Sequence, residues 1–248
     1  MRPVVLVSLV VALAACSGGD DHPARATGQA ATLTAPTTRP RPVTSARRLA
    51  DARIARATVL RSRDLPGWTL QRRTSDAAGT ATLDRLCPAL ARTRRDLELA
   101  EGGALPAAET AYVNGQRGLP VLRSKAYVLA DPALASRMFA LVSSKAYARC
   151  VAQSFTAPAL GVTTVRYGTP KVSALAVRRI GNDTAAYGAA IPARTGATSF
   201  DIHLDLVAAR RGRIVDVLVL GDTDLLPLST RARAAIMRVV GLRLYATS

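Results

Sequence analysis

The second half of the sequence contains five successive segments in which apolar and polar residues alternate with a period of two. Such alternation is typical of β-strands that bury one face. The segments are residues 162–167, 171–178, 184–191, 199–208 and 213–220. Their connections are too short for the crossovers that parallel strands need, so the pattern predicts an antiparallel sheet. Arg210-Arg211-Gly212 predicts a hairpin turn between the last two strands.

Helical patterns lie on either side of this run, and the first half adds shorter strands. Asp131-Pro132 predicts a helix start, with a capping acid followed by proline at the first helical position. The helix is expected to break at Ser143-Ser144 and to continue through Val151. Further helices are predicted over residues 46–62, 82–90 and 229–242, and strands over 68–73, 111–113 and 122–129. The expected fold class is α+β: an antiparallel sheet with helices packed mainly on one face.

The N-terminus predicts export. Arg2 precedes an apolar run over residues 4–13, which is about half of the ~20 residues that a membrane-spanning helix needs. Leu13-Ala14-Ala15-Cys16 resembles the lipobox of bacterial lipoproteins, in which the cysteine thiol receives a diacylglyceride and becomes the first mature residue. Two or more acyl chains, palmitate among them, hold a protein firmly on a membrane. An ordinary signal peptide with a coincidental cysteine is the alternative.

Two cysteines remain once Cys16 is assigned to lipidation. Cys87 and Cys150 form an even pair in a compartment that permits disulfides, so we expect a bridge between them. The chain-entropy model assigns about 4 kcal/mol to a cross-link of this loop length. A redox couple of free thiols is the alternative, but the pair lacks the C-x-x-C spacing of such couples.

The composition divides the chain into three parts. Residues 1–15 are predicted to be a signal peptide. Residues 16–44 follow with Ser, Gly, Ala, Thr and Pro and almost no large apolar residue, which is typical of a tether beginning at the lipidated cysteine. As a flexible coil, the 28 residues after Cys16 would span about 30 Å. Residues 45–248 show no second linker and are predicted to form a single disulfide-linked domain.

Short motifs in this domain resemble a known family. Leu65-Pro66-Gly67-Trp68, the Cys87/Cys150 pair, the segment Gly181-Asn182-Asp183-Thr184-Ala185-Ala186-Tyr187 and the hairpin over 207–215 together look like an exported actinobacterial domain family. That family includes the extracellular sensor domains of PknH-type serine/threonine kinases and related lipoproteins. The resemblance implies a small α+β domain with a cleft, associated with sensing or binding rather than catalysis, and it supplies no catalytic motif.

One strand carries candidate metal ligands. Asp201, His203 and Asp205 alternate with apolar residues and therefore share one face of the predicted strand. They would suit a divalent cation, or a histidine base in a metal-assisted hydrolase. A solvent-facing strip on a half-buried strand is the simpler interpretation. Asp222 and Asp224 follow the last predicted strand and could belong either to a calcium-binding loop or to an ordinary turn. Neither a G-x-S-x-G nucleophile motif nor a phosphate-binding glycine loop occurs, so we expect no enzyme and no cofactor.

The charge is strongly basic. The chain has 34 Lys+Arg against 17 Asp+Glu, a formal net charge of +17, and lysine occurs only three times. GC-rich codon usage would explain the arginines without a function. Nucleic acid is the common partner of basic proteins, but an exported domain rarely meets it. Anionic lipids and acidic envelope polymers are the polyanions outside a bacterial membrane. The last predicted helix carries four arginines: Arg231, Arg233, Arg238 and Arg243. They could contact a lipid surface, or they could form an ordinary solvent-exposed helix face.

These features together predict an extracytoplasmic lipoprotein, anchored to the cell membrane through Cys16, with a sensor-like domain that binds an amphiphilic or acidic envelope ligand. A cleft between sheet and helices, with aliphatic walls and arginines at its rim, would suit that task. The alternative is a protein-interaction module that docks on an envelope enzyme or kinase. Nothing in the sequence identifies the binding residues.

Overall fold

The computed structural model describes residues 44–73, 84–114, 120–156 and 164–248. The predicted signal peptide and Cys16 lie outside the described residues, as does the predicted tether up to its last residue, Thr44. In the described part of the chain, no helix has the length and apolar character that crossing a membrane requires.

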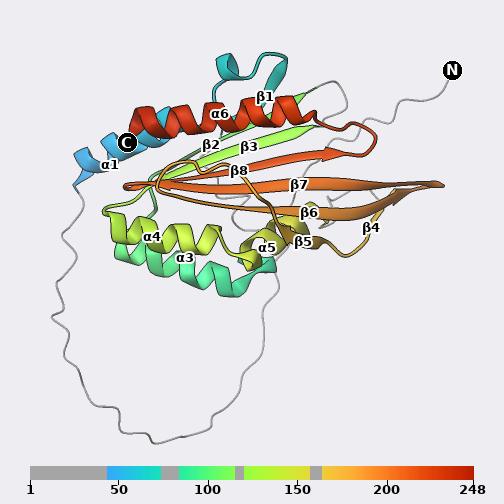
Figure 1. Cartoon of the computed structure of the whole chain (residues 1–248). Coiled ribbons are helices and arrows are strands. Elements are labelled where there is room, and N and C mark those ends of the chain that lie inside the picture. The colour runs from blue at the N-terminus through green and yellow to red at the C-terminus, as the bar shows by residue number, and fades with distance from the viewer. Residues whose placement is uncertain (1–43, 74–83, 115–119, 157–163) are drawn as a thin grey trace, which may run out of the picture.

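The described residues build one antiparallel sheet of eight strands. Its order is β1-β2-β3-β8-β7-β6-β4, and β5 also pairs with β6 (Figure 1). All pairings are antiparallel, which confirms the predicted α+β class. The strands are β1 (Trp68–Arg73), β2 (Ala107–Asn114), β3 (Val121–Val128), β4 (Val165–Tyr167), β5 (Lys171–Ala174), β6 (Asp183–Thr195), β7 (Thr198–Arg211) and β8 (Ile214–Thr223).

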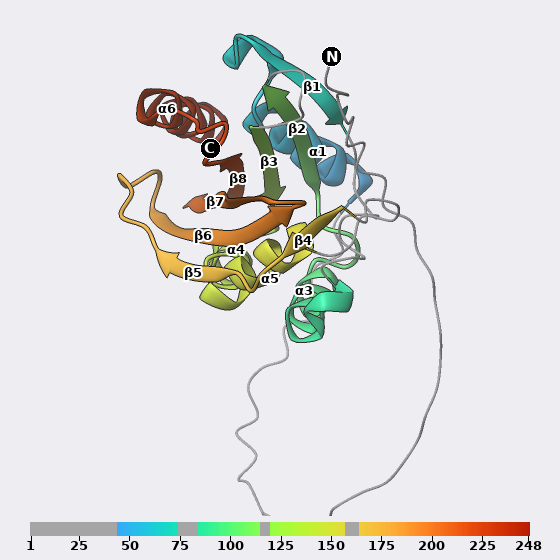
Figure 2. The ribbon, with the colours of Figure 1, turned by 90° about the vertical axis from the view of Figure 1, so that its right-hand side faces the viewer.

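Helices cover both faces of the sheet, whereas the sequence predicts helices mainly on one face; the central strand β8 is buried at every position and so accepts a helical layer on each side. Helices α3, α4 and α5 lie on one face, and α1 and α6 lie on the other (Figures 1 and 2). The sheet is strongly curved, so that β1, β2 and β3 stand steeply to β6 and β7 (Figure 2). The helices are α1 (Ser45–Thr58), α3 (Pro88–Ala100), α4 (Pro132–Val142), α5 (Lys145–Thr156) and α6 (Thr230–Thr247), with a short 3₁₀ turn, η1 (Ser62–Asp64).

The core consists of two apolar layers separated by the sheet, and β8 contributes to both. Val215, Val217 and Val219 pack toward α4 and α5. Leu218 and Leu220 pack on the other side, with residues of α6. Every residue of β8 is buried, because helices cover both faces of this central strand. Among the described residues, the buried apolar side chains run from Ala55 to Leu244, so this part of the chain has an apolar core of its own.

Side-chain caps start three of the helices where the sequence places them. Asp131 accepts a hydrogen bond from the Leu134 N–H at 2.8 Å, which confirms the predicted start of α4 at Pro132. Ser229 caps α6 in the same way, by accepting from the Ala232 N–H at 3.2 Å. Thr44 caps α1. Each cap satisfies a backbone N–H that has no partner inside the helix.

Most predicted elements are present, and several differ in extent from the prediction. The helix expected over residues 82–90 is α3, which begins at Pro88 and continues to Ala100. Residues 84–86 are also helical, the helical conformation is interrupted at Cys87, and Pro88 opens the longer helix α3. The strand expected over 171–178 is shorter, since β5 ends at Ala174. By contrast, β6 and β7 extend to 13 and 14 residues, because they pair with each other over their whole length.

The family-like motifs form turns that close the long hairpins. Gly212 adopts a φ of 56° in the turn between β7 and β8, as the predicted hairpin requires. Gly181 has a φ of 74°, and a Cβ there would lie 2.5 Å from the carbonyl oxygen of Arg210. Asn182 accepts a hydrogen bond from the Gly212 N–H at 3.0 Å. Asp183 pairs with Arg210, whose Nε lies 2.6 Å from the carboxylate. These residues have a structural role.

Candidate ligand-binding cleft

A cleft of about 110 Å³ lies between the sheet and the layer of α3, α4 and α5. This volume has room for several water-sized groups. It therefore suits a short alkyl segment or a ring rather than a whole lipid. The apolar lining residues are Leu90, Ala91, Tyr127, Met138, Leu141, Val142, Tyr147, Val151, Phe155, Val217 and Val219.

The sheet supplies the floor of the cleft. Arg123, Lys125 and Tyr127 of β3 all line it, because alternate residues of a strand share a face. In the neighbouring strand β8, Val219 pairs with Arg123 and Val217 pairs with Lys125. The floor therefore combines an aliphatic strip from β8 with the cationic and aromatic side chains of β3.

A disulfide joins two of the helices that form the walls. Cys87, directly before α3, is bonded to Cys150 in α5, and their Cα atoms are 6.1 Å apart. This confirms the predicted pairing. Cys87 itself lines the cleft, as do Leu90 of α3 and Val151 of α5. Because the bridge fixes α3 beside α5, it also fixes the width of the cleft.

Two cations of the cleft are paired with carboxylates. Lys125 Nζ lies 3.3 Å from Glu109 Oε2, on directly opposed residues of β3 and β2. Arg94 of α3 contacts Asp84 and Glu98, each at 2.5 Å. These partners neutralise both charges, so neither cation is available without breaking an existing ion pair.

Arg123 differs from the other two cations. Its side chain is exposed, and it therefore lies where the cleft meets solvent. Among the described residues it has no carboxylate partner, and its guanidinium lies 6.0 Å from the centre of the Phe155 ring. A contact at this distance is at the outer limit of a cation–π interaction. Within the described ranges, Arg123 thus places a positive charge without a carboxylate partner beside an apolar cavity.

Two ionisable side chains of the cleft, Lys125 and Tyr147, have shifted pKa values. Burial alone would lower the pKa of Lys125, but Tyr127 and Glu109 favour the ammonium, and the net pKa is raised. Lys125 is therefore a cation at neutral pH. Burial raises the pKa of the Tyr147 phenol, so that this side chain stays neutral. The cleft consequently combines apolar surface, the neutral Tyr147 hydroxyl and paired charges, and Arg123 adds a positive charge at its exposed side.

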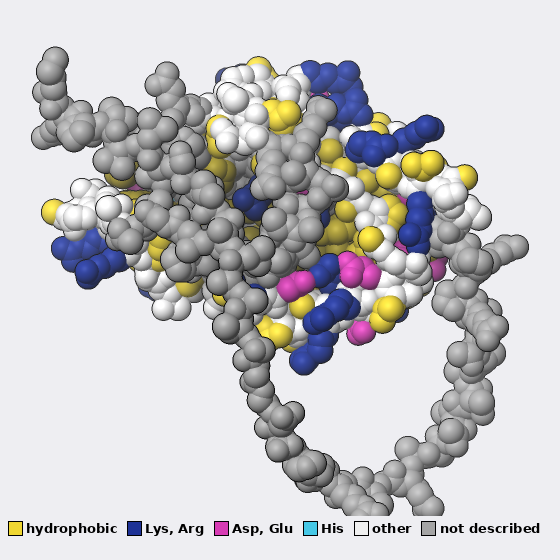
Figure 3. All heavy atoms as spheres, turned by 180° about the vertical axis from the view of Figure 1, so that it is seen from behind, with side chains coloured by type: hydrophobic (Ala, Val, Ile, Leu, Met, Phe, Trp, Pro, Cys, Tyr) yellow, Lys and Arg dark blue, Asp and Glu magenta, His cyan; other side chains and the backbone are white. Residues whose placement is uncertain are grey.

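A ligand that fits this arrangement has an apolar part and an acidic group. The apolar part would displace water from the aliphatic and aromatic walls, and the acidic group would meet the Arg123 guanidinium. In Figure 3, hydrophobic side chains are visible in the middle of this side of the molecule, with basic and acidic side chains below them. Ser154 also lines the cleft, but its hydroxyl donates to the Val151 carbonyl of the same helix.

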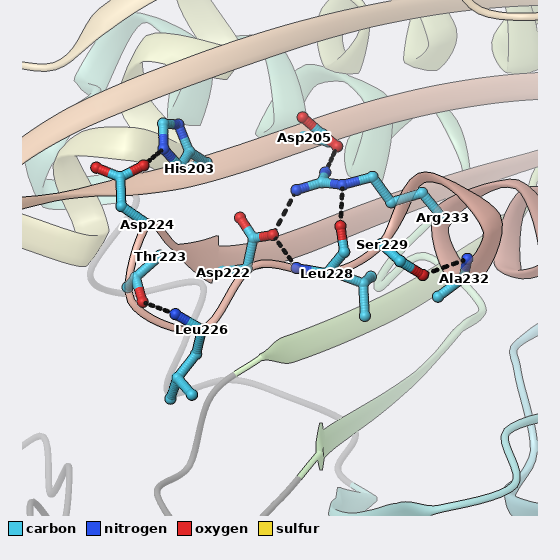
Figure 4. A network of polar contacts seen from close by, with 10 residues as sticks. All are labelled: His203, Asp205, Asp222, Thr223, Asp224, Leu226, Leu228, Ser229, Ala232 and Arg233. Carbon is cyan, nitrogen blue, oxygen red and sulfur yellow. Dashed lines mark hydrogen bonds and ion pairs between the residues drawn. The ribbon is translucent and has the colours of Figure 1, made fainter.

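The residues predicted as metal ligands lie elsewhere, where β7 and β8 meet the start of α6 (Figure 4). His203 and Asp205 follow each other on the same face of β7, as the alternation predicts. His203 Nε2 lies 2.5 Å from Asp224 Oδ1. Asp201 takes part through its backbone, whose N–H donates to Asp224 Oδ2 at 3.0 Å. The hydrogen bonds from His203 and from the Asp201 backbone lower the pKa of Asp224.

Asp205 and Asp222 are bridged by an arginine of α6. Arg233 contacts both carboxylates, with 2.6 Å between its guanidinium and Asp222 Oδ2 (Figure 4). The same oxygen accepts from the Leu228 N–H. Burial raises the pKa of Asp222, although that hydrogen bond acts in the opposite direction. This network fastens the N-terminal end of α6 to the sheet, and Arg233 is therefore not free to contact a lipid.

Within the described ranges, no group of three or more His, Cys, Asp or Glu side chains is arranged to hold a metal ion.

The sequence alone does not single out the cleft residues. The alternation of Arg123, Lys125 and Tyr127 in a predicted strand is a usable signal, since three such residues on one face are unusual for a strand covered by helices. The partners of these residues come from distant segments, which one sequence does not bring together.

No protein-family model matches the chain. The curated proteins also contain no match. Among solved structures, the chain is similar to the extracellular domain of PknH from Mycobacterium tuberculosis, at 10% sequence identity and a TM-score of 0.44. The match covers 82% of this chain and 98% of that chain. This is a distant likeness of fold, and it does not show membership of the actinobacterial family.

Proposed function

We propose that the protein is a cell-envelope lipoprotein whose extracytoplasmic domain binds an amphiphilic, acidic ligand in the cleft between the sheet and helices α3, α4 and α5, without catalysing a reaction on it. The observation that carries this proposal is the position of Arg123. Its positive charge has no carboxylate partner in the described part of the chain, and it borders an apolar cavity. Family membership, export and lipidation at Cys16 rest on the sequence motifs.

Recognition would divide between two parts of the ligand. The apolar walls would provide most of the affinity, because burial of apolar surface contributes about 25 cal/mol per Å². Arg123 would provide selectivity for an anion, since a charge-assisted hydrogen bond contributes roughly 1.5–3 kcal/mol. A ligand with the same apolar part and a cationic head would face repulsion at this position.

The test uses residues 44–248 and two fluorescent probes with the same alkyl chain, one ending in a carboxylate and the other in a trimethylammonium group. The domain should bind the carboxylate probe more tightly. Arg123→Glu should weaken binding of the carboxylate probe by about tenfold or more and reverse the preference. Arg137→Glu, an exposed residue of α4 outside the cleft lining, is the matched control.

Equal affinity of the domain for both probes would contradict an acidic ligand. Failure to bind either probe would contradict the amphiphile itself and would favour the second hypothesis, a module that docks on an envelope protein. An effect of Arg137→Glu as large as that of Arg123→Glu would show that only the overall charge matters.

A further inference from the structure

The two helical layers carry very different charges. Residues 44–65 and 229–248, which contain α1, η1 and α6, have ten arginines and two aspartates. Residues 84–103 and 131–156, which contain α3, α4 and α5, have seven basic and five acidic residues. Of the two helical layers, the one opposite the cleft thus carries most of the net positive charge. Codon usage alone would not explain this asymmetry, because it acts on both layers.

The two aspartates of this layer do not neutralise its outer surface. Asp51 is buried and pairs with Arg213, with 2.9 Å between Nη2 and Oδ1, and with Arg47, with 3.7 Å between Nε and Oδ2. Asp64 is largely buried and accepts hydrogen bonds from Arg243 Nε at 2.6 Å and from the Arg61 N–H at 2.7 Å. Both carboxylates therefore stabilise the layer from within.

The outward side of the layer is cationic and partly apolar, and we name it the α1/α6 surface. Its exposed arginines are Arg53, Arg56, Arg63, Arg231 and Arg238. Three large apolar side chains accompany them: Leu49, Leu242 and Tyr245, which are 63%, 65% and 55% exposed. In the view from behind, basic side chains are visible at the upper right of the molecule, and basic and acidic side chains lie together lower down (Figure 3).

Helical spacing aligns these residues in two stripes. Leu49, Arg53 and Arg56 are four and three residues apart in α1, so they share one side of that helix. In α6, Arg238, Leu242 and Tyr245 are related in the same way. The Tyr245 ring stacks on the guanidinium of Arg211, with 3.6 Å between the guanidinium carbon and the ring centre. Each stripe combines basic and apolar side chains, as in helices that lie on membrane surfaces.

We infer that the α1/α6 surface rests on a bilayer of anionic lipids. The arginines would meet the negative head groups, and Leu49 and Leu242 would reach toward the acyl region. Ser45 opens α1, so the segment after Cys16 joins the domain at this layer; this last point depends on the lipid anchor proposed above. In this orientation the cleft layer, on the other face of the sheet, points away from the membrane (Figure 2).

The test uses residues 44–248, which lack Cys16, so that no acyl chain contributes. Binding is measured by sedimentation with vesicles of phosphatidylglycerol and phosphatidylcholine in equal parts, and with vesicles of phosphatidylcholine alone. The domain should bind the anionic vesicles and not the neutral ones, and salt should weaken the binding. The triple variant Arg53→Glu, Arg56→Glu and Arg238→Glu should bind at least about 100-fold more weakly, since each basic residue near the surface contributes about 1 kcal/mol and each glutamate adds repulsion.

The matched control reverses the same number of exposed charges on the other layer: Arg92→Glu, Arg137→Glu and Arg149→Glu. This variant should keep most of the vesicle binding. An equal loss in both triple variants, or no binding of the unmodified domain to anionic vesicles, would overturn the inference. Neither outcome would affect the ligand proposal, which is measured without vesicles.

A second pair of substitutions separates a bilayer from a soluble acidic polymer. Leu49→Ser together with Leu242→Ser should weaken binding to anionic vesicles, because these side chains contribute apolar contact. The same variant should elute from a cation-exchange resin as the unmodified domain does. Unchanged vesicle binding would overturn the lipid assignment in favour of a charged polymer.

Discussion

Asp216 is an acidic residue buried in the apolar core. It lies in the middle of β8, with Ala126 of β3 and Ala209 of β7 as its cross-strand neighbours. The side chain is 1% exposed, and within the described part of the chain neither carboxylate oxygen has a hydrogen-bond partner. Burial therefore raises the pKa of Asp216 to about 7, so that the folded protein holds a proton there at mildly acidic pH.

This residue predicts an unusual dependence of stability on pH. The unfolded chain releases the Asp216 proton near pH 3.8, whereas the folded chain retains it up to about pH 7. The contribution of Asp216 to stability is therefore greatest below pH 3.8, declines as the pH rises toward 7, and is constant above that. Asp216→Asn should remove this decline and raise the free energy of unfolding above pH 7 by on the order of 4 kcal/mol.

The measurement is urea unfolding of residues 44–248 across the pH range, with Asp96→Asn as the control. Asp96 is an exposed residue of α3, so its replacement should leave the pH profile unchanged. A profile that is the same for Asp216→Asn and for the unmodified domain would contradict a buried, protonated Asp216.

At the level of elements, the disulfide between Cys87 and Cys150 affects both the stability of the fold and the shape of the cleft. Replacing Cys87 and Cys150 together with alanine should lower the free energy of unfolding by about 4 kcal/mol, because the unfolded chain gains the freedom of a long loop. Because α3 would no longer be fixed to α5, affinity for the anionic alkyl probe should also fall. Urea unfolding and probe titration measure the two effects. A loss of stability below about 1 kcal/mol would show that the bridge adds little to the packing of α3.

The sequence predicts an element well where one or two neighbouring residues determine where that element begins or ends. Asp131-Pro132 starts α4, and Gly212 closes the β7–β8 hairpin, because a cap or a positive φ is determined by one or two residues. Pro88 is ambiguous by contrast, since a proline opens a helix or interrupts it depending on the residues around it. The floor of the cleft requires knowledge of which helices cover β3. That depends on packing between segments far apart in the sequence.

At the scale of the whole molecule, the domain divides into a cleft layer and a layer that we propose faces the membrane. Helices α3, α4 and α5 carry mixed charges around an apolar cavity, and α1 and α6 carry the basic surface. The central sheet holds both layers in a fixed relation. A ligand bound in the cleft would therefore be presented away from the bilayer.

Attachment to the membrane gives a prediction for the full chain. Cys16→Ser should move the protein from the membrane fraction to the soluble fraction in the presence of high salt, because the cationic surface alone is screened under those conditions. Cell fractionation followed by immunoblotting measures this shift. Retention of Cys16→Ser in the membrane fraction at high salt would contradict lipidation as the anchor.

The central proposal is that the cleft holds an amphiphilic, acidic molecule. The decisive experiment is native mass spectrometry of residues 44–248, purified gently from the organism that makes the protein. We expect a stoichiometric extra mass that organic solvent extracts, that carries an acidic group, and that is lost in Arg123→Glu but kept in Arg137→Glu. A mass equal to that of the polypeptide alone, in the unmodified domain, would contradict the proposal and favour docking on another protein.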